Sequence, residues 1–374
     1  MVIVWMFCWL ISMYCVYQGG RTLNDHVVAL FVTLCMIVYL IWWFLFPDTI
    51  YKNLLLLGPI SMTFLFVVLV RRKEVSHSLV YLGLYLSQIA YALSLFGWGI
   101  YFPWILFAHI SEIPLWNHWV FGVASLCTVW GVVYTYRKYE HCNIYRLGTL
   151  GIRVVQISDI HVSPTMTREH VQHLIEKVNA LEPDILLATG DFVMPFSEDN
   201  HEYLYSCLQQ SIAPVYACLG NHDLPVREKM IRCFEDHGMT MLVDTYDILV
   251  CKGRRIWIGG LDFLWKGAQE HTQKILQQWM DDEDCDAKIL LIHDPRYFGW
   301  LPSIFDLVCA GHTHGGQFGL NALGFPVSLL RPLGVYDQGF FQKDTMKLYV
   351  HKGNWHTGLP PRIGIAAEIA VFDL

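Results

Sequence analysis

The chain has 374 residues and a formal net charge of −7, with 54% hydrophobic and only 16% charged residues. An acidic chain without a basic stripe does not favour nucleic-acid binding, and eleven irregularly spaced cysteines indicate no disulfide framework. The charges are unevenly distributed, because residues 1–136 carry five Lys/Arg and four Asp/Glu whereas residues 137–374 carry 21 and 29. Length and composition therefore predict two domains, of which only the second is acidic.

The first part of the chain is apolar and almost uncharged, which is typical of a transmembrane domain. About five membrane spans are predicted, at Val2–Tyr17, Val27–Phe46, Asn53–Val70, within Leu79–Phe107, and at His118–Tyr134. The first segment lacks a basic start and a small-residue cleavage site, so it is interpreted as a retained helix and not as a signal peptide. We expect an all-α, multi-span transmembrane domain over residues 1–136, a linker over 137–150 and a second domain over 151–374.

Basic residues flank the predicted spans at two places, Arg71–Lys73 and Arg137–Lys138. The loop between the last two spans contains no Lys or Arg. Because cytoplasmic loops are rich in Lys and Arg, both basic clusters are predicted to face the cytoplasm, and the two spans between them are consistent with this. We therefore expect a multi-pass membrane protein whose second domain is cytoplasmic, where a reducing environment suits the free cysteines.

The second part contains five apolar runs that each end in polar side chains. A helix is predicted over Thr167–Leu181, between the first two runs. Runs of this kind are typical of strands buried on both faces, and the carboxyl ends of such strands meet at one edge of a sheet. The pattern predicts an α/β fold with a site at that edge. The five runs are IRVVQISDIH (152–161), PDILLATGD (183–191), APVYACLGNHD (213–223), AKILLIHDP (287–295) and FDLVCAGHTH (305–314).

The last run ends in two histidines, His312 and His314, with glycines on both sides. In an extended chain alternate side chains point the same way, so both imidazoles are expected on one side and Thr313 on the other. A glycine at Gly311 removes a Cβ that would crowd the turn. Two polar residues in a surface turn are an equally good interpretation of an isolated His-x-His motif.

The other motifs are also ambiguous when each is taken alone. Asp191 could cap the following helix, and His293 could be a hydrogen-bonded core histidine. Five successive strand ends with oxygen or imidazole ligands are better explained by metal binding, and carboxylates, an amide and four imidazoles suit two divalent ions with a bridging carboxylate. Cys218 and Cys309 lie inside the apolar runs and are expected in the core, so a thiolate zinc site is not favoured.

Taken together, the motifs resemble those of the calcineurin-like metallophosphoesterases. The matching motifs cover residues 153–319 and are Asp159-x-His161, Gly190-Asp191, Gly220-Asn221-His222-Asp223, His293 and Gly311-His312-x-His314. The segments AGHTHGGQ and LYVHKGNWHTGLPPRIG resemble a branch of that family that often follows membrane anchors. The resemblance implies an αββα sandwich for the second domain.

The resemblance also implies a role for each motif residue. Two divalent ions, Mn, Fe, Zn or similar, would be bound, and a metal-bound hydroxide would attack the phosphorus. One ion would be held by Asp159, His161 and His314, the other by Asn221, His293 and His312, with Asp191 as the bridge. His222 would donate a proton to the leaving group and would be oriented by Asp223.

Two positions depart from the pattern of the family. Met194 stands where relatives often have a second Asp, and His351-Lys352-Gly353 stands where this branch often has Ser-Arg-Gly. Lys352 keeps a cation there but not the bidentate fork of an arginine. Arg362 could supply such a fork, or it could be a solvated surface residue. Lys352 and Arg362 are therefore the candidate substrate-binding residues, and the substrate class stays open.

These features predict a membrane-anchored, dinuclear-metal phosphoesterase that hydrolyses a phosphoester or pyrophosphate bond. Five spans exceed what an anchor needs. Four tryptophans near the span ends suit the membrane interface, namely Trp42, Trp43, Trp98 and Trp104. A lipid or lipid-linked substrate is therefore favoured. The alternatives are an enzyme that acts on a soluble substrate and is merely tethered, and a non-catalytic membrane sensor or scaffold. A transporter is disfavoured, since the spans contain almost no ionisable residues. The bilayer and the substrate are the expected partners.

Overall fold

The computed structural model describes residues 141–162, 166–194, 202–279, 284–317, 319, 321, 326–328, 330–355, 362 and 364–374, and six helical residues between 123 and 134. The chain divides into two compact units, and nearly all described residues belong to the unit formed by residues 134–358 and 362–374. Among the described residues, none of the helices has the length and apolar character needed to cross a bilayer. The first four predicted spans and most of the fifth lie outside the described residues.

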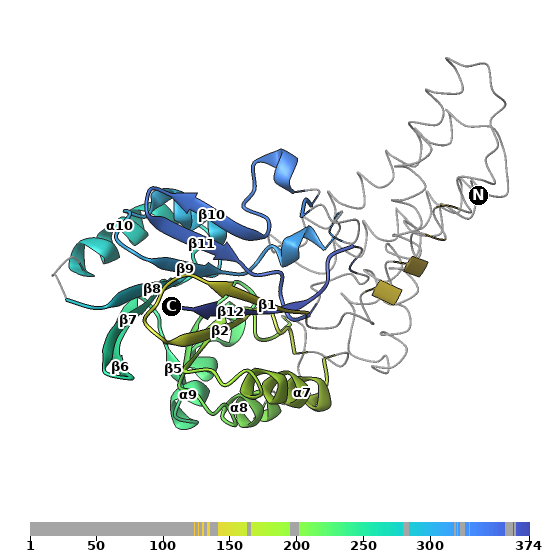
Figure 1. The fold of residues 1–374 in the computed structure, drawn as a ribbon, viewed down its shortest axis with the longest axis horizontal. Coiled ribbons are helices and arrows are strands. Elements are labelled where there is room, and N and C mark those ends of the chain that lie inside the picture. The colour runs from red at the N-terminus through yellow and green to blue at the C-terminus, as the bar shows by residue number, and fades with distance from the viewer. Residues whose placement is uncertain are drawn as a thin grey trace, which may run out of the picture. The chain divides into compact units, whose positions relative to one another are not determined.

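Two six-stranded sheets form the centre of the second unit (Figure 1). In the first sheet, β2 to β5 are parallel, β12 is antiparallel to β2, and β1 is parallel to β12 at the edge. Its strands, in spatial order, are β1 (His141–Arg146), β12 (Glu368–Asp373), β2 (Arg153–Ile157), β3 (Ile185–Thr189), β4 (Val215–Cys218) and β5 (Thr240–Met241).

The second sheet has a parallel centre and two antiparallel edge strands. Strands β7, β8, β9 and β11 are parallel to their neighbours, whereas β6 and β10 pair with β7 and β11 in the antiparallel direction. The order of the strands is β10 (Gly339–Lys343), β11 (Met346–Val350), β9 (Leu307–Ala310), β8 (Ala287–Leu291), β7 (Arg254–Gly260) and β6 (Thr245–Cys251).

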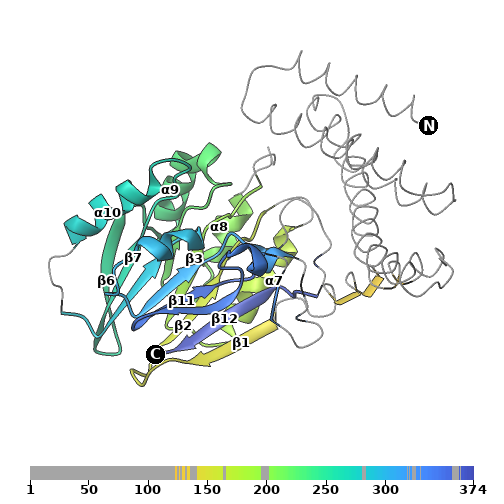
Figure 2. The ribbon, with the colours of Figure 1, turned by 90° about the horizontal axis from the view of Figure 1, so that it is seen from above.

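Helices cover the outer face of each sheet. Figures 1 and 2 show α7 (Arg168–Asn179), α8 (Glu202–Leu208) and α9 (Arg227–Asp236) on the first sheet and α10 (Ala268–Trp279) on the second. The 3₁₀ helix η2 (Pro295–Trp300) packs beside α10 in the outer core of the second sheet. The unit is therefore an αββα sandwich, as the sequence predicts.

The alternation of side chains along the central strands explains the three cores of the sandwich. In β3, Ile185 and Leu187 lie in the core between the sheets, whereas Leu186 and Ala188 face the core beneath α7 and α8. In β9 the same alternation puts Leu307 between the sheets and the next residue under α10. Because both faces of these strands are covered, every position is apolar and the sequence reads as an unbroken run.

The predicted elements are confirmed in most places. The five apolar runs form β2, β3, β4, β8 and β9, and the helix predicted over Thr167–Leu181 is α7, with Thr167 as its N-cap. The buried Cys218 and Cys309 lie in the core between the sheets, as expected. The predicted linker over 137–150 needs a correction, because it contains β1. Only one face of this edge strand packs, with Tyr145 against Tyr349, whereas Ile144 on the other face is exposed.

Candidate metal centre

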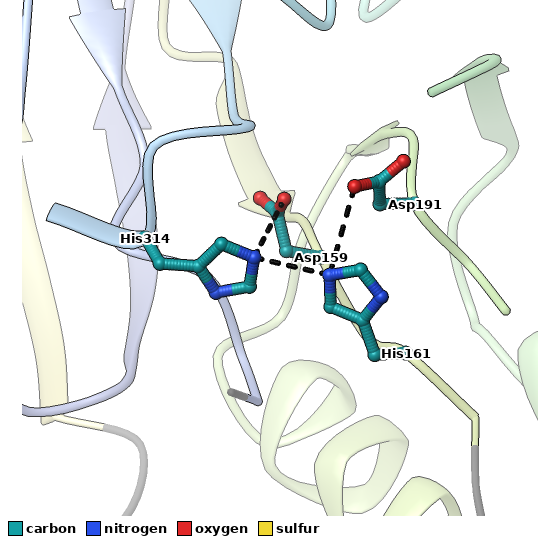
Figure 3. A group of neighbouring side chains, drawn as sticks. All are labelled: Asp159, His161, Asp191 and His314. Carbon is teal, nitrogen blue, oxygen red and sulfur yellow. Dashed lines mark hydrogen bonds and ion pairs between the residues drawn. The ribbon is translucent and has the colours of Figure 1, made fainter. Parts of the chain in front are cut away.

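Polar side chains beyond the carboxyl ends of β2, β3, β8 and β9 form two groups of potential metal ligands. The donor atoms of each group lie within 4.8 Å of one another. The first group contains Asp159, His161, Asp191 and His314 (Figure 3), and the second contains Asp191, His293 and His312. Asp191 is common to both groups, as expected of a bridging carboxylate.

The first group brings two imidazoles and two carboxylates together in the interior. The Nε2 atoms of His161 and His314 are 3.0 Å apart. Asp159 Oδ1 lies 3.3 Å from His314 Nε2, and Asp191 Oδ2 lies 3.6 Å from His161 Nε2 (Figure 3). All four side chains are buried. Nitrogen and carboxylate donors that converge in this way are ligands for zinc and other divalent transition metals.

The second group is built around His293. Its Nε2 atom lies 3.3 Å from Asp191 Oδ2 and 3.2 Å from His312 Nδ1. Asn221 Oδ1 is 3.2 Å from the same nitrogen, so the amide predicted as a ligand also belongs here. The structure thus brings together all seven residues predicted as metal ligands, in the two sets that the resemblance implies.

The hydrogen bonds of the imidazoles fit the binding of a cation. His293 Nδ1 is 2.7 Å from the Thr189 carbonyl oxygen, and His314 Nδ1 is 3.0 Å from the Trp355 carbonyl oxygen. A ring nitrogen that faces a carbonyl carries the proton, so Nε2 of each ring presents a lone pair towards the centre. Lone pairs and carboxylate oxygens that point at one another are stabilised by a positive ion between them, and the residues therefore fit divalent metals.

Burial favours the neutral form of several imidazoles of the centre. It lowers the pKa of His161 to about 3 and, together with the neighbouring His293, the pKa of His312 to about 4. Metal-binding imidazoles must be neutral. At His293 the Asp191 and Asp159 carboxylates outweigh burial and raise the pKa to about 10, so a metal ion would displace a proton there. Burial, together with the nearby Asp191 carboxylate, raises the pKa of Asp159 to about 7. A divalent ion would favour the ionised carboxylate by direct charge attraction.

The backbone is unusual at the ligands. Five of them have positive φ angles, which are uncommon for residues other than glycine: Asp159 at 53°, His161 at 47°, Asp191 at 55°, His312 at 73° and His314 at 51°. Such conformations each cost about 1–3 kcal/mol and cluster at functional sites. The strand ends therefore turn sharply at the ligands, which aims side chains from separate strands at one point.

From the sequence, His312 and His314 are expected to converge because alternate side chains of an extended chain point the same way, and the backbone shows that this reason is wrong. The chain beyond β9 is not extended, because both histidines have left-handed conformations and His314 begins the 3₁₀ helix η3 (His314–Gly316). Thr313 is turned away, and its hydroxyl donates to the Asp337 carbonyl. Both imidazoles reach the centre as predicted, but each joins a different group. At Gly311 a Cβ would collide with Ser158 and Asp159, so the close approach expected there is confirmed.

Asp223 has a different role from the expected one. Its carboxylate accepts hydrogen bonds from the backbone N–H groups of Asp191 at 2.8 Å, Phe192 at 2.9 Å and Gly220 at 2.9 Å. The hydrogen bonds of the described residues include none between the side chains of Asp223 and His222. The buried carboxylate instead ties the loop that carries Asp191 to the loop that follows β4. Asp223 therefore positions the shared ligand, since its oxygens are occupied by these donors.

His222 lies beside the two groups but belongs to neither. Its Nε2 atom is 3.8 Å from Asp191 Oδ2, and its ring meets the His161 ring edge-on, with centroids 5.0 Å apart. The side chain is 24% exposed, unlike the buried ligands around it. Burial nevertheless lowers the pKa of its imidazole. The role of His222 as proton donor stays a prediction.

The two candidate substrate-binding cations are engaged within the protein. The Lys352 ammonium lies 2.6 Å from an oxygen of Glu368, a fully buried carboxylate. Asn143 and Tyr349 also donate hydrogen bonds to Glu368. The interpretation of Lys352 as a free phosphate-binding cation is therefore not supported. The signal that could have revealed this partner is Glu368 itself, an acidic residue between apolar residues at the start of β12.

Arg362 is buried and not a solvated surface residue. Its guanidinium donates hydrogen bonds to the carbonyl oxygens of Lys352, Gly353 and Trp355. The Trp355 carbonyl is the same group that faces Nδ1 of the ligand His314. Arg362 therefore supports the backbone that orients a predicted metal ligand. Its guanidinium points into the protein and not, as considered from the sequence, towards a substrate phosphate.

Sequence reasoning missed one further polar residue, Gln156 in the middle of β2. Its side-chain amide donates to Thr189 Oγ1 at 2.9 Å and to the Ala310 carbonyl at 3.0 Å. It therefore joins β2 and β3 of the first sheet to β9 of the second, directly below the strand ends that carry the ligands. A single polar residue within an otherwise apolar run is the signal that could have identified it.

Comparison with known proteins identifies the class that this fold and centre define. The sequence profile described as "Calcineurin-like phosphoesterase" matches residues 152–316. The uncharacterized metallophosphoesterase YkuE of Bacillus subtilis is 31% identical over 235 residues, which cover 60% of this chain and 79% of that protein. The chain belongs to the calcineurin-like metallophosphoesterase family, and it is accordingly a metal-dependent hydrolase.

More distant relatives extend the comparison. The "Transmembrane protein with metallophosphoesterase domain" of Danio rerio is 29% identical over 246 residues, covering 59% of this chain and 52% of that protein. The phosphodiesterase YaeI of Escherichia coli is 25% identical over 183 residues, covering 46% of this chain and 64% of that protein. A solved dimetal phosphatase from Danio rerio has 10% identity and a TM-score of 0.35, and the match covers 55% of this chain and 88% of that one.

Proposed function

We propose that this protein is a membrane-anchored phosphoesterase that binds two divalent ions and hydrolyses a phosphoester or pyrophosphate bond of a lipid or lipid-linked substrate. The observation that carries the proposal is the position of Asp191 between the two donor groups. One carboxylate shared by two sets of imidazoles suits a bridged pair of ions, which can stabilise both the attacking and the leaving oxygens. The family membership supports hydrolysis as the reaction.

Each donor group would hold one ion in this proposal. When bound, the ions supply a nucleophilic water at neutral pH and offset charge on the phosphoryl oxygens. Burial favours the neutral imidazole at His161, His312 and His314. Carbonyl acceptors fix the tautomers of His293 and His314, and Asp223 holds the backbone N–H of Asp191. The ligand sets are Asp159, His161, Asp191 and His314 for one ion, and Asp191, Asn221, His293 and His312 for the other.

His222 is the residue that we propose to move a proton. An alkoxide leaving group needs a proton, and histidine titrates in the range where such transfers are efficient. We assign the donated proton to Nε2, because Nδ1 is buried and has no hydrogen-bond partner among the described residues. The partial exposure of the side chain leaves room for a substrate oxygen beside it. Asp191 is 3.8 Å away and attracts the protonated form before transfer.

The membrane part of the proposal rests on the first 136 residues and on named relatives. These residues are apolar and nearly uncharged, and relatives from Danio rerio and Bos taurus are named transmembrane proteins. The described helical residues before the second unit include exposed apolar side chains at Leu126, Val129 and Trp130. With the basic clusters on the cytoplasmic side, the catalytic domain would act on the cytoplasmic leaflet or on a soluble substrate next to it.

The decisive experiment uses the whole chain purified in detergent. Elemental analysis should find two transition-metal ions per chain, and a phosphoester panel should show faster turnover of lipid substrates such as phosphatidic acid and prenyl pyrophosphates than of p-nitrophenyl phosphate. A single ion per chain would contradict the bridged pair. Turnover of soluble esters alone would favour a tethered enzyme, and no turnover with both ions bound would favour the non-catalytic scaffold.

A further inference from the structure

A large apolar side chain is exposed close to the metal centre. Trp265 lies in the loop between β7 and α10, and 66% of its surface is accessible. Its indole ring meets the ring of Phe263 edge-on, with centroids 4.9 Å apart and planes at 84°. Tryptophan is seldom left so exposed, and an exposed apolar surface next to a site is informative.

Phe263 connects this indole to the second donor group. Its side chain is buried, and its ring centroid lies 6.0 Å from that of His293 and 6.1 Å from that of His312. Both histidines are predicted metal ligands of the more open group. A continuous series of ring contacts therefore runs from the exposed indole to the ligands, which puts Trp265 at the border of the centre.

The loop that carries Trp265 is firmly held. The Asp262 carboxylate accepts a hydrogen bond from Arg227 at 2.7 Å, and its backbone N–H donates to Asp244 at 3.0 Å. The N–H of Leu264 donates to the Tyr297 hydroxyl at 2.8 Å. Arg227 begins α9, shortly after the loop that carries the proposed proton donor. Hydrogen bonds to α9 and to Tyr297 therefore fix the loop that carries the indole.

A flat apolar surface on a fixed support suits the recognition of an apolar group. Aromatic side chains have few rotatable bonds, so they lose little conformational entropy when they bind a ligand. The Arg227 cation beside this loop is paired with Asp262, so the exposed indole adds an apolar surface to this border. We propose that Trp265, backed by Phe263, is a specificity-determining residue that contacts an aryl or alkyl group carried on the phosphorus of the substrate.

This inference rests on the proposed phosphoesterase function and is tested by three substrates with one leaving group. The p-nitrophenyl esters of methyl-, phenyl- and n-hexylphosphonic acid lose the same nitrophenolate and differ only in the retained group. Trp265→Ala in the metal-loaded whole chain should lower the phenyl-to-methyl or the hexyl-to-methyl ratio of kcat/KM about tenfold, mainly through KM. A fall in the phenyl-to-methyl ratio alone indicates that the indole contacts a flat ring of the substrate. A fall in the hexyl-to-methyl ratio alone indicates that it contacts an alkyl chain. Either result supports the proposal.

The control is Val250→Ala, which truncates another exposed apolar side chain of the same sheet. Val250 lies near the end of β6 that pairs with the start of β7, at the opposite edge from the metal centre. This variant should keep the wild-type ratios. Trp265→Phe should keep more of the phenyl ratio than Trp265→Ala does, since a smaller ring can still stack.

Two outcomes would overturn the inference. Unchanged ratios in Trp265→Ala, or an equal loss for all three esters, would show that the indole does not contact the retained group. These outcomes leave the phosphoesterase function standing, because the wild type still turns the esters over. If the wild type with both ions bound hydrolyses none of them, the proposed function fails and the role of Trp265 fails with it.

Discussion

The first donor group is closed on all sides, whereas the second opens towards solvent. Asp159, His161 and His314 are buried, and the interior carbonyl of Trp355 orients one of the imidazoles. In the second group His312 is only partly buried. The partly exposed His222 lies beside Asp191, which both groups share. In the proposed enzyme, the buried group would hold its ion and the group with the partly exposed imidazole would face the substrate.

Asp191 is the only residue common to the two donor groups, so its replacement should have the largest effect. Asp191→Asn removes a negative charge from each group, so we expect both ions to be lost and turnover to fall to the background rate. His161→Ala, by contrast, should mainly empty the closed group. Elemental analysis of the purified variants measures this directly. If Asp191→Asn keeps two ions per chain, the shared carboxylate is not a bridge.

Replacing His222 separates substrate chemistry from metal binding. His222→Asn should leave the metal content near normal and lower turnover by roughly 10²–10⁴-fold, the usual contribution of a general acid. The loss should be smaller for nitrophenyl esters, whose leaving group departs with little help from a proton. His312→Asn is the matched control and should lose metal and activity together for every ester. Loss of an ion in His222→Asn would instead make this histidine a ligand.

Replacing Arg362 tests whether the first donor group depends on the hydrogen bonds that this arginine donates to nearby carbonyl groups. Arg362→Met removes one donor from each of three carbonyl groups in the interior and should cost about 2–4 kcal/mol in the free energy of unfolding. It should also weaken the binding of one ion by about 10–100-fold, because the carbonyl that orients His314 is released. Thermal unfolding and graded chelation measure the two effects. Arg254→Met, at an exposed ion pair with Asp286, should cost less than about 1 kcal/mol.

Equal weakening of both ions in Arg362→Met would contradict the assignment of this arginine to the closed group. Unchanged binding of both ions, in a variant that is destabilised, would limit its role to the fold.

The ion pair between Lys352 and Glu368 predicts that the effect of replacing Lys352 depends on pH. Although burial acts in the opposite direction, the Lys352 ammonium lowers the pKa of Glu368. A carboxyl with a lowered pKa in the folded state contributes stability above its unfolded pKa of about 4.3, and this contribution is lost as the pH falls through the folded value. Lys352→Met should therefore cost about 3 kcal/mol at neutral pH and progressively less below about pH 4.

Urea unfolding at several pH values measures this difference between wild type and Lys352→Met. A cost that does not change with pH would mean that the ion pair with Glu368 is not its source. A large rise in KM with unchanged stability would restore Lys352 as a substrate-binding cation.

Much of the fold and of the centre could be predicted from the sequence, because the information is local. A strand covered on both faces is apolar at most positions, so β2, β3, β4, β8 and β9 are visible as runs even though β2 contains Gln156 and β8 contains Lys288. The carboxyl ends of parallel strands meet at one edge, so the residues after these runs, such as Asp159 and His293, are expected together. The order of these motifs is sufficient to indicate the family and to predict which residues bind the metals.

Other features were decided only by the tertiary structure, because they depend on contacts between distant residues or on backbone turns. His312 and His314 enter different groups through left-handed conformations that no residue pattern encodes. Glu368 accepts a hydrogen bond from Asn143, 225 positions away. The strand β1 likewise pairs with the distant β12, so its local sequence does not reveal it as a strand. Asp223 and Arg362 have backbone partners, and backbone groups are identical along the chain. A sequence shows which side chains carry charge, but the packing of the sheets decides which partner each charge meets.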